Sequence, residues 1–171
     1  MKKLGIAVAL LMAACGSSKT FESYSAAPNP DPRIGLRHGL TNAAVAAWNL
    51  RLVSNAPTPE GFKAGWASDI AFNRNYAIQG NFNGWQVWDI SNPAAPKTAH
   101  SFICPGSQSD VSVYHNLLFV SGESLSGRLD CGAQGVPDPV SHDRLRGLRI
   151  FDITNISAPK YIGNVQTCRG S

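Results

Sequence analysis

Residues that could bind a ligand or take part in catalysis gather in one polar segment of the chain, residues 124–146. This segment carries Asp130, His142 and Asp143, and it is rich in arginine, glycine and proline. Glycine and proline favour turns, so the segment is expected to form a long loop. Most polar loops are simply solvated, but long loops on a rigid scaffold also carry binding sites. We therefore take these three residues as candidates for contact with a ligand.

Asp69 and Asp110 are a second pair of candidates. Each lies in a Ser-Asp-Ile or Ser-Asp-Val segment, and the two residues are 41 positions apart. If the segments are equivalent parts of a repeat, the two carboxylates could line one shared site at the mouth of a central channel. A turn cap that recurs with the repeat is the simpler explanation.

No familiar catalytic or cofactor-binding motif accompanies these acidic residues. The sequence has no Gly-x-Ser-x-Gly elbow, no phosphate-binding loop and no zinc-binding helix motif. The acidic residues of 124–146 lack the spacing of a calcium loop. The four histidines are scattered, and His115 is expected in a tight turn. We therefore predict no metal and no cofactor, and we assign no catalytic residue.

The elements that would position these side chains are set by an internal repeat. Residues 84–97 and 147–160 share one pattern: glycine, a mostly apolar strand, Asp-Ile-Ser/Thr-Asn, and a final Pro-Lys. Each repeated unit reads as four short strands separated by turn residues, with no helical periodicity. The Asp-Ile-Ser-Asn-Pro corner is typical of a turn, because Asp and Asn bond nearby amides and proline ends the ladder.

Four-stranded antiparallel units of about 40 residues are the blades of a β-propeller. We therefore predict an all-β fold, a partial β-propeller of two four-stranded antiparallel blades plus one extra strand. The blades are expected at residues 66–105 and 106–171, with 124–146 as an insertion in the second. A lead-in, residues 41–65, is expected to supply the extra strand at residues 50–54, and residues 43–48 could form a helical turn.

The repeated tract resembles the LVIVD repeat found in secreted and surface propeller proteins of bacteria. The resemblance covers about residues 49–171, and it departs from the family where Trp88 and Phe151 replace an aliphatic residue. It implies a propeller of about six or seven blades, of which this chain would be an N-terminal piece. The family shares no single activity, so the resemblance implies a fold and a surface address rather than a reaction.

Three cysteines lie within the predicted blades: Cys104, Cys131 and Cys168. In a propeller, the loops that hold them emerge on the same face. One disulfide is expected in an oxidising compartment, with three pairings possible and one thiol left over. We expect Cys131 to pair with Cys104 or Cys168. A metal site formed by all three is disfavoured, because no Cys-x-x-Cys or His-x-His spacing is present.

The N-terminus is typical of a bacterial export signal. Two lysines precede an apolar run, residues 4–14, which is too short to span a bilayer comfortably. Cys15 then follows two alanines, which resembles the lipobox of lipoproteins. We predict a signal peptide at residues 1–14, a lipid on Cys15 and a flexible tether over residues 15–40. The alternative is an ordinary cleaved signal with a chance cysteine.

Charge and composition limit the classes of partner that the protein is expected to bind. The net charge of +4 includes Lys2 and Lys3 and shows no basic stripe, so nucleic acid is not an expected partner. The sequence predicts a cell-envelope protein, on the periplasmic or surface face, held to the membrane by its lipid. We expect it to bind an unknown protein or glycan. The alternatives are a hydrolase-like or lyase-like enzyme with its site at the channel mouth, and a purely structural envelope protein.

Overall fold

The computed structural model describes residues 26–138 and 140–167. The chain divides into two units, residues 1–51 and residues 52–171. In the described part of the first unit, from residue 26, there is no helix or strand, and Asp31 forms an ion pair with Arg33. Every described strand belongs to the second unit.

The first blade is a four-stranded antiparallel sheet in the order β1-β2-β3-β4. Its strands are β1 (Ala67–Asn73), β2 (Tyr76–Asn81), β3 (Gly84–Asp89) and β4 (Lys97–Ile103). The register runs without interruption between β2 and β3, and it is shifted once between β1 and β2 and once between β3 and β4. This arrangement agrees with the four short strands predicted for the unit from its sequence.

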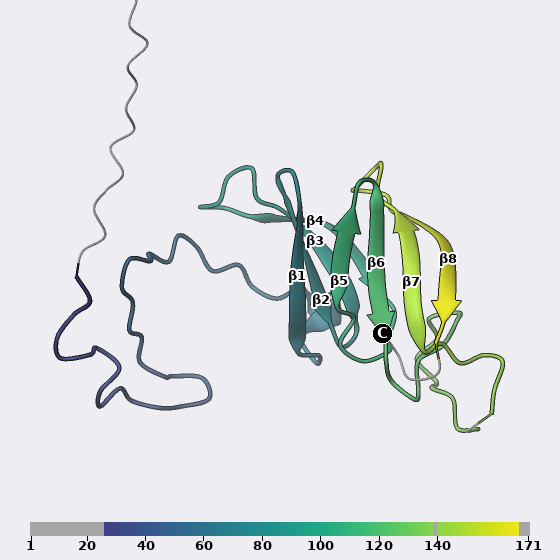
Figure 1. Ribbon diagram of the computed structural model, residues 1–171, viewed down its shortest axis with the longest axis horizontal. Coiled ribbons are helices and arrows are strands. Elements are labelled where there is room, and N and C mark those ends of the chain that lie inside the picture. Colours follow the sequence, from purple (N-terminus) through teal and green to yellow (C-terminus); the bar gives the residue numbers. More distant parts are fainter. Residues whose placement is uncertain (1–25, 139, 168–171) are drawn as a thin grey trace, which may run out of the picture. The chain divides into compact units, whose positions relative to one another are not determined.

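The second blade repeats this arrangement in the order β5-β6-β7-β8. Its strands are β5 (Val111–Tyr114), β6 (Leu117–Gly122), β7 (Gly147–Asp152) and β8 (Lys160–Gln166). The register shift between β7 and β8 falls at the place equivalent to the shift between β3 and β4. The two sheets confirm the prediction of an all-β fold with two propeller-like blades (Figure 1).

The repeated Asp-Ile-Ser/Thr-Asn corner is a turn in both blades. Asp89 Oδ1 accepts hydrogen bonds from the amide and the hydroxyl of Ser91, at 2.9 and 2.6 Å. Asp152 Oδ1 accepts the equivalent pair from Thr154, at 2.8 and 2.6 Å. These bonds lower the pKa of both carboxyl groups. The aspartates are therefore turn residues, as the sequence predicts.

The core lies in the seam where one face of the first blade packs on one face of the second. Trp85 of β3 meets Phe151 of β7 edge to face, with ring centroids 5.1 Å apart, and Phe102 of β4 lies 4.9 Å from Phe151. At one edge of this seam β1 lies against β5 (Figure 1). The buried cluster consists of Ile78, Trp85, Val87, Val111, Leu118, Val120, Phe151 and Ile153.

The lead-in differs from the prediction. Residues 50–54 form no strand and residues 43–48 no helix, and the lead-in contains only the short 3-10 helix η1 (Glu60–Phe62). A strand exists only where a neighbour pairs its backbone groups, and alternating leucines do not supply that neighbour. Leu50 and Leu52 are instead 83% and 81% exposed. The prediction of an extra strand is therefore wrong.

No helix in the described ranges has the length and apolar character that a membrane crossing needs.

Candidate functional site

The insertion is joined to the end of the first blade by a disulfide between Cys104 and Cys131. The two Cα atoms are 4.4 Å apart, and the cysteines are separated by 27 positions in sequence. Cys104 directly follows β4 and is only 2% exposed. This is one of the pairings that the sequence left open. Cys168 lies outside the described residues, as do the signal segment and Cys15.

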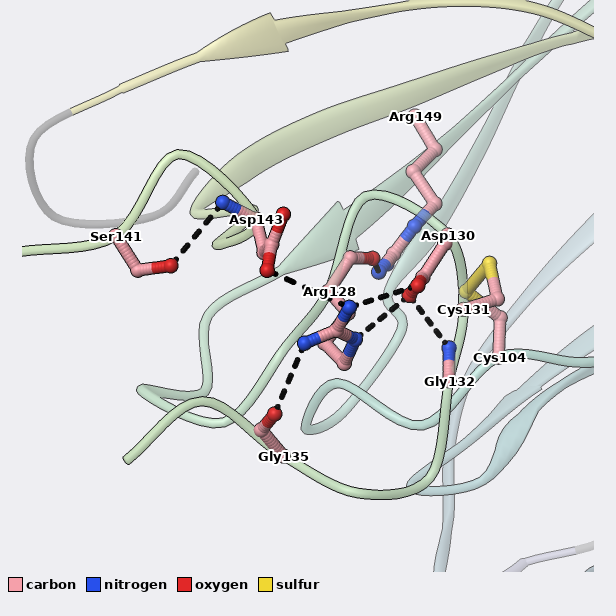
Figure 2. Close-up of polar contacts among 9 residues, drawn as sticks. All are labelled: Cys104, Arg128, Asp130, Cys131, Gly132, Gly135, Ser141, Asp143 and Arg149. Carbon is pink, nitrogen blue, oxygen red and sulfur yellow. Dashed lines mark hydrogen bonds and ion pairs between the residues drawn. A yellow bond between two sulfur atoms is a disulfide. The ribbon is translucent and has the colours of Figure 1, made fainter. Parts of the chain in front are cut away.

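Arg128 organises the inside of the insertion (Figure 2). Its Nε and Nη2 donate to the two carboxylate oxygens of Asp130, both at 2.7 Å, and its Nη1 donates to the carbonyl of Gly135 at 3.3 Å. Asp143 Oδ2 lies 3.6 Å from the same guanidinium. The guanidinium and the amide of Gly132 hold the pKa of Asp130 far below its usual range.

These contacts separate the three candidate residues of the insertion into two kinds. Asp130 is engaged by Arg128 and by the Gly132 amide, so its carboxylate serves to shape the loop. His142 is exposed, and the Asp143 side chain is 66% exposed with a longer contact to Arg128, at 3.6 Å against 2.7 Å for Asp130. His142 and Asp143 are therefore the members that a ligand could reach directly.

Arg149 supports the insertion through a hydrogen bond, a role that was not predicted from the sequence. It lies on β7, is 1% exposed, and its Nη2 donates to the carbonyl of Arg128 at 2.9 Å (Figure 2). Its guanidinium packs against Gly106 and Gly122, where a Cβ atom would come within 3.3 and 3.1 Å of Nη1. Burial lowers the pKa of Arg149. The available signal was an arginine in an otherwise apolar strand.

Asp69 is part of the contact between the two blades. Its Oδ2 accepts a hydrogen bond from the amide of Val111, the first residue of β5, at 3.3 Å, and Ser68 beside it donates to the carbonyl of Gln108. The seam is so close here that a Cβ on Gly80 would lie 2.1 Å from the carbonyl oxygen of Ser109. The Asp69 carboxylate thus joins one blade to the next.

Asp110 occupies the equivalent position of the second blade. Its amide donates to Ser121 Oγ at 2.9 Å, and its carbonyl accepts from the Ser121 amide. Within the part of the chain that the structure describes, no three acidic, histidine or cysteine side chains come together as a metal site. His115 occupies the turn between β5 and β6 with a φ of 53°, the turn position predicted for it.

Comparison with protein families identifies the repeats. The family model of the LVIVD repeat matches residues 64–103 and residues 143–167. The first match spans β1 to β4, and the second spans β7 and β8 with the end of the insertion. No curated protein and no solved structure matches the chain significantly. The chain is therefore a repeat protein with β-propeller-like blades, and over these two segments it is similar to the LVIVD repeat.

Proposed function

We propose that the protein is a lipid-anchored component of the cell envelope, attached through Cys15, and that its blades form a scaffold for binding a protein or glycan. The apolar run at residues 4–14, followed by Cys15, supports the anchor. The disulfide between Cys104 and Cys131 is in keeping with export to an oxidising compartment, where such bonds persist. An acyl anchor with two chains gives stable membrane attachment.

The anchoring of the insertion is the observation that carries the binding role. Three features hold the loop to the blades or to itself: the Cys104–Cys131 disulfide, the Arg128 ion pairs, and the bond from Arg149 to the carbonyl of Arg128. A loop fixed in this way loses little conformational entropy when a partner binds. His142 and Asp143 remain exposed on it, which suits contact with a partner surface.

The carboxylates favour binding over catalysis at the channel mouth. An acid–base pair must lie within hydrogen-bond reach of the reacting group. Asp69, one of the two aspartates predicted at that position, is instead engaged by the Val111 amide, and Asp130 by Arg128. Carboxylates that stabilise the fold in this way are not available as an acid–base pair. A binding scaffold does not need such a pair, because it requires only an exposed surface that a partner recognises.

The anchor is tested by mass spectrometry of the mature N-terminus from membrane fractions. We expect a diacylated cysteine at position 15, and a Cys15→Ser variant that is absent from the lipid-modified fraction. An unmodified N-terminus at another residue would contradict the anchor.

The binding role is tested by quantitative crosslinking in intact cells. The parent is compared with a His142→Ala/Asp143→Ala double variant and with a Lys97→Gln control variant on β4. We expect one or more envelope partners to lose crosslinking to the double variant alone. Equal crosslinking of all three chains would contradict a binding role for the insertion.

A further inference from the structure

A polar groove of about 390 Å³ lies in the second unit, apart from the insertion. It is formed by the β1–β2 turn, the β5–β6 turn and the segment after β7. In each antiparallel blade these connections lie at the end opposite to the β2–β3 and β6–β7 connections, and the insertion belongs to the latter. The lining residues are Asn73, Arg74, Tyr76, His115, Asn116, Ile153, Thr154 and Ile156.

The repeat places one basic side chain from each blade in this groove. Arg74 and His115 hold the same position of the first turn in their blades, and both have a φ of 53°. Asn73 Nδ2 donates to the carbonyl of His115 at 3.5 Å, which connects the two turns directly. The left-handed backbone is uncommon for residues other than glycine, and asparagine, aspartate and histidine are the most frequent exceptions. One basic residue from each blade therefore takes this conformation at the same groove.

The remaining lining residues offer neutral hydrogen-bonding groups above an apolar floor. Asn116 Nδ2 is 3.3 Å from Asp152 Oδ1 and 3.2 Å from Thr154 Oγ1, so the amide is held in place. Ile153 is buried at the base, and Tyr76 adds an aromatic ring. No acidic residue is among the lining residues in the described chain, and the neighbouring Asp152 carboxylate accepts hydrogen bonds from Asn116 and Thr154. The groove therefore combines positive charge, fixed polar groups and apolar surface, as sites for small polar ligands do.

We propose that this groove binds a small sugar-like molecule that carries an oxyanion, either a carboxylate or a phosphate. An arginine guanidinium matches the geometry of both anions and bonds them through two N–H groups. Hydroxyl groups on the body of the ligand would meet Asn116 and Thr154, while its apolar face would lie toward Tyr76. The volume of the groove falls within the range of small-molecule sites.

The direct test is calorimetric titration of the full chain with three probes: glucuronate, glucose 6-phosphate and glucose. We expect at least one of the two anionic sugars to bind about tenfold or more tightly than neutral glucose, since a charge-assisted bond is lost with the anion. Binding of only the carboxylate, or only the phosphate, identifies which anion the groove accepts. Equal affinity for all three probes, or none for any, overturns the proposal.

Matched variants localise the binding to the groove. Arg74→Asn and His115→Asn remove the basic groups with a residue that tolerates the left-handed backbone, so both variants should fold. We expect Arg74→Asn to weaken the affinity for the anionic sugar about tenfold, and Arg74→Lys to retain part of the affinity that Arg74→Asn loses. Lys63→Gln, an exposed basic residue outside the groove, serves as the control. If Arg74→Asn unfolds at the parent's temperature and binds as tightly as the parent, the proposal is wrong.

The groove lies at the opposite end of the blades from the insertion. If the chain crosslinks through His142 and Asp143 but does not bind anionic sugars, the proposed function stands and the proposed groove site is wrong. If it binds anionic sugars but does not crosslink through these residues, only the groove site stands.

Discussion

The third strands of the two blades have nearly the same sequence pattern but different surroundings. Trp85 and Val87 of β3 are 1% and 0% exposed, because the second blade covers them. Leu148 and Ile150 hold the equivalent positions of β7, yet they are only half-buried. Burial of a blade face thus depends on the neighbouring blade and not on the strand alone. Among the described residues, one such face is covered and its repeat is not.

Each of these strands also has one buried polar residue, and its hydrogen-bond partner differs between the two blades. In β3, Gln86 Nε2 donates to Gln79 Oε1 on the neighbouring strand at 2.7 Å, and Trp88 shares that acceptor at 3.1 Å. In β7 the equivalent of Gln86 is Arg149, and its cross-strand neighbour is Val120, which offers no acceptor. Arg149 instead reaches the insertion. The first blade therefore has a side-chain hydrogen bond within its sheet at this position, whereas the second blade has a hydrogen bond to its insertion.

The largest expected effect comes from truncating the covered face. Trp85→Ala should lower the free energy of unfolding by about 3–5 kcal/mol, because a large buried ring leaves a cavity. Leu148→Ala, at the equivalent place, should cost only about 1 kcal/mol, since part of its surface is already in water. Denaturant unfolding of both variants measures the difference. Equal losses would contradict the asymmetry of the two faces.

The disulfide should give the next largest effect. Breaking the Cys104–Cys131 bond opens a loop of 27 positions, and the chain entropy regained on unfolding corresponds to about 3–4 kcal/mol. We expect Cys131→Ser to match the parent under reducing conditions and to show no further loss when reductant is added. If the unfolding midpoint of the parent is the same with and without reductant, the disulfide does not stabilise the blades.

A smaller loss is expected from closing the space at the seam. A methyl group on Gly80 would meet the Ser109 carbonyl oxygen at 2.1 Å, so Gly80→Ala should cost about 1–3 kcal/mol through overpacking. Gly163→Ala on β8 is the matched control, because nothing lies within 4 Å of its added Cβ. Thermal unfolding compares the two. A Gly80→Ala variant as stable as Gly163→Ala would place the blades further apart than described.

The smallest effect concerns acid stability. The folded pKa of Asp130 is lowered by Arg128, so its contribution to stability is present above the unfolded pKa of about 4 and is lost as the pH falls below it. Asp130→Asn should therefore flatten that part of the pH profile relative to the parent. Unfolding midpoints at pH 7 and at pH 3 provide the comparison. Parallel profiles would mean that the ion pair adds no stability.

The repeat explains why much of the fold was predictable from sequence. Two copies of one pattern locate the strands, and the Asp and Asn residues of the corner form the expected turns. The prediction for residues 50–54 was wrong, because alternating apolar and polar residues indicate a possible strand but not the strand that would pair with it. The role of Arg149 was not predictable, since it depends on which loop folds over β7. The Arg74–His115 groove likewise depends on how two blades pack, which local patterns do not encode.

The contact between Trp85 and Phe151 tests the packing of the two blades most directly. The rings meet edge to face across the seam at 5.1 Å. A double-mutant cycle with Trp85→Leu and Phe151→Leu should give a coupling energy of about 0.5–1.5 kcal/mol, as for other aromatic pairs. Effects that simply add, to within about 0.3 kcal/mol, would show that the two repeats do not pack face to face as propeller blades.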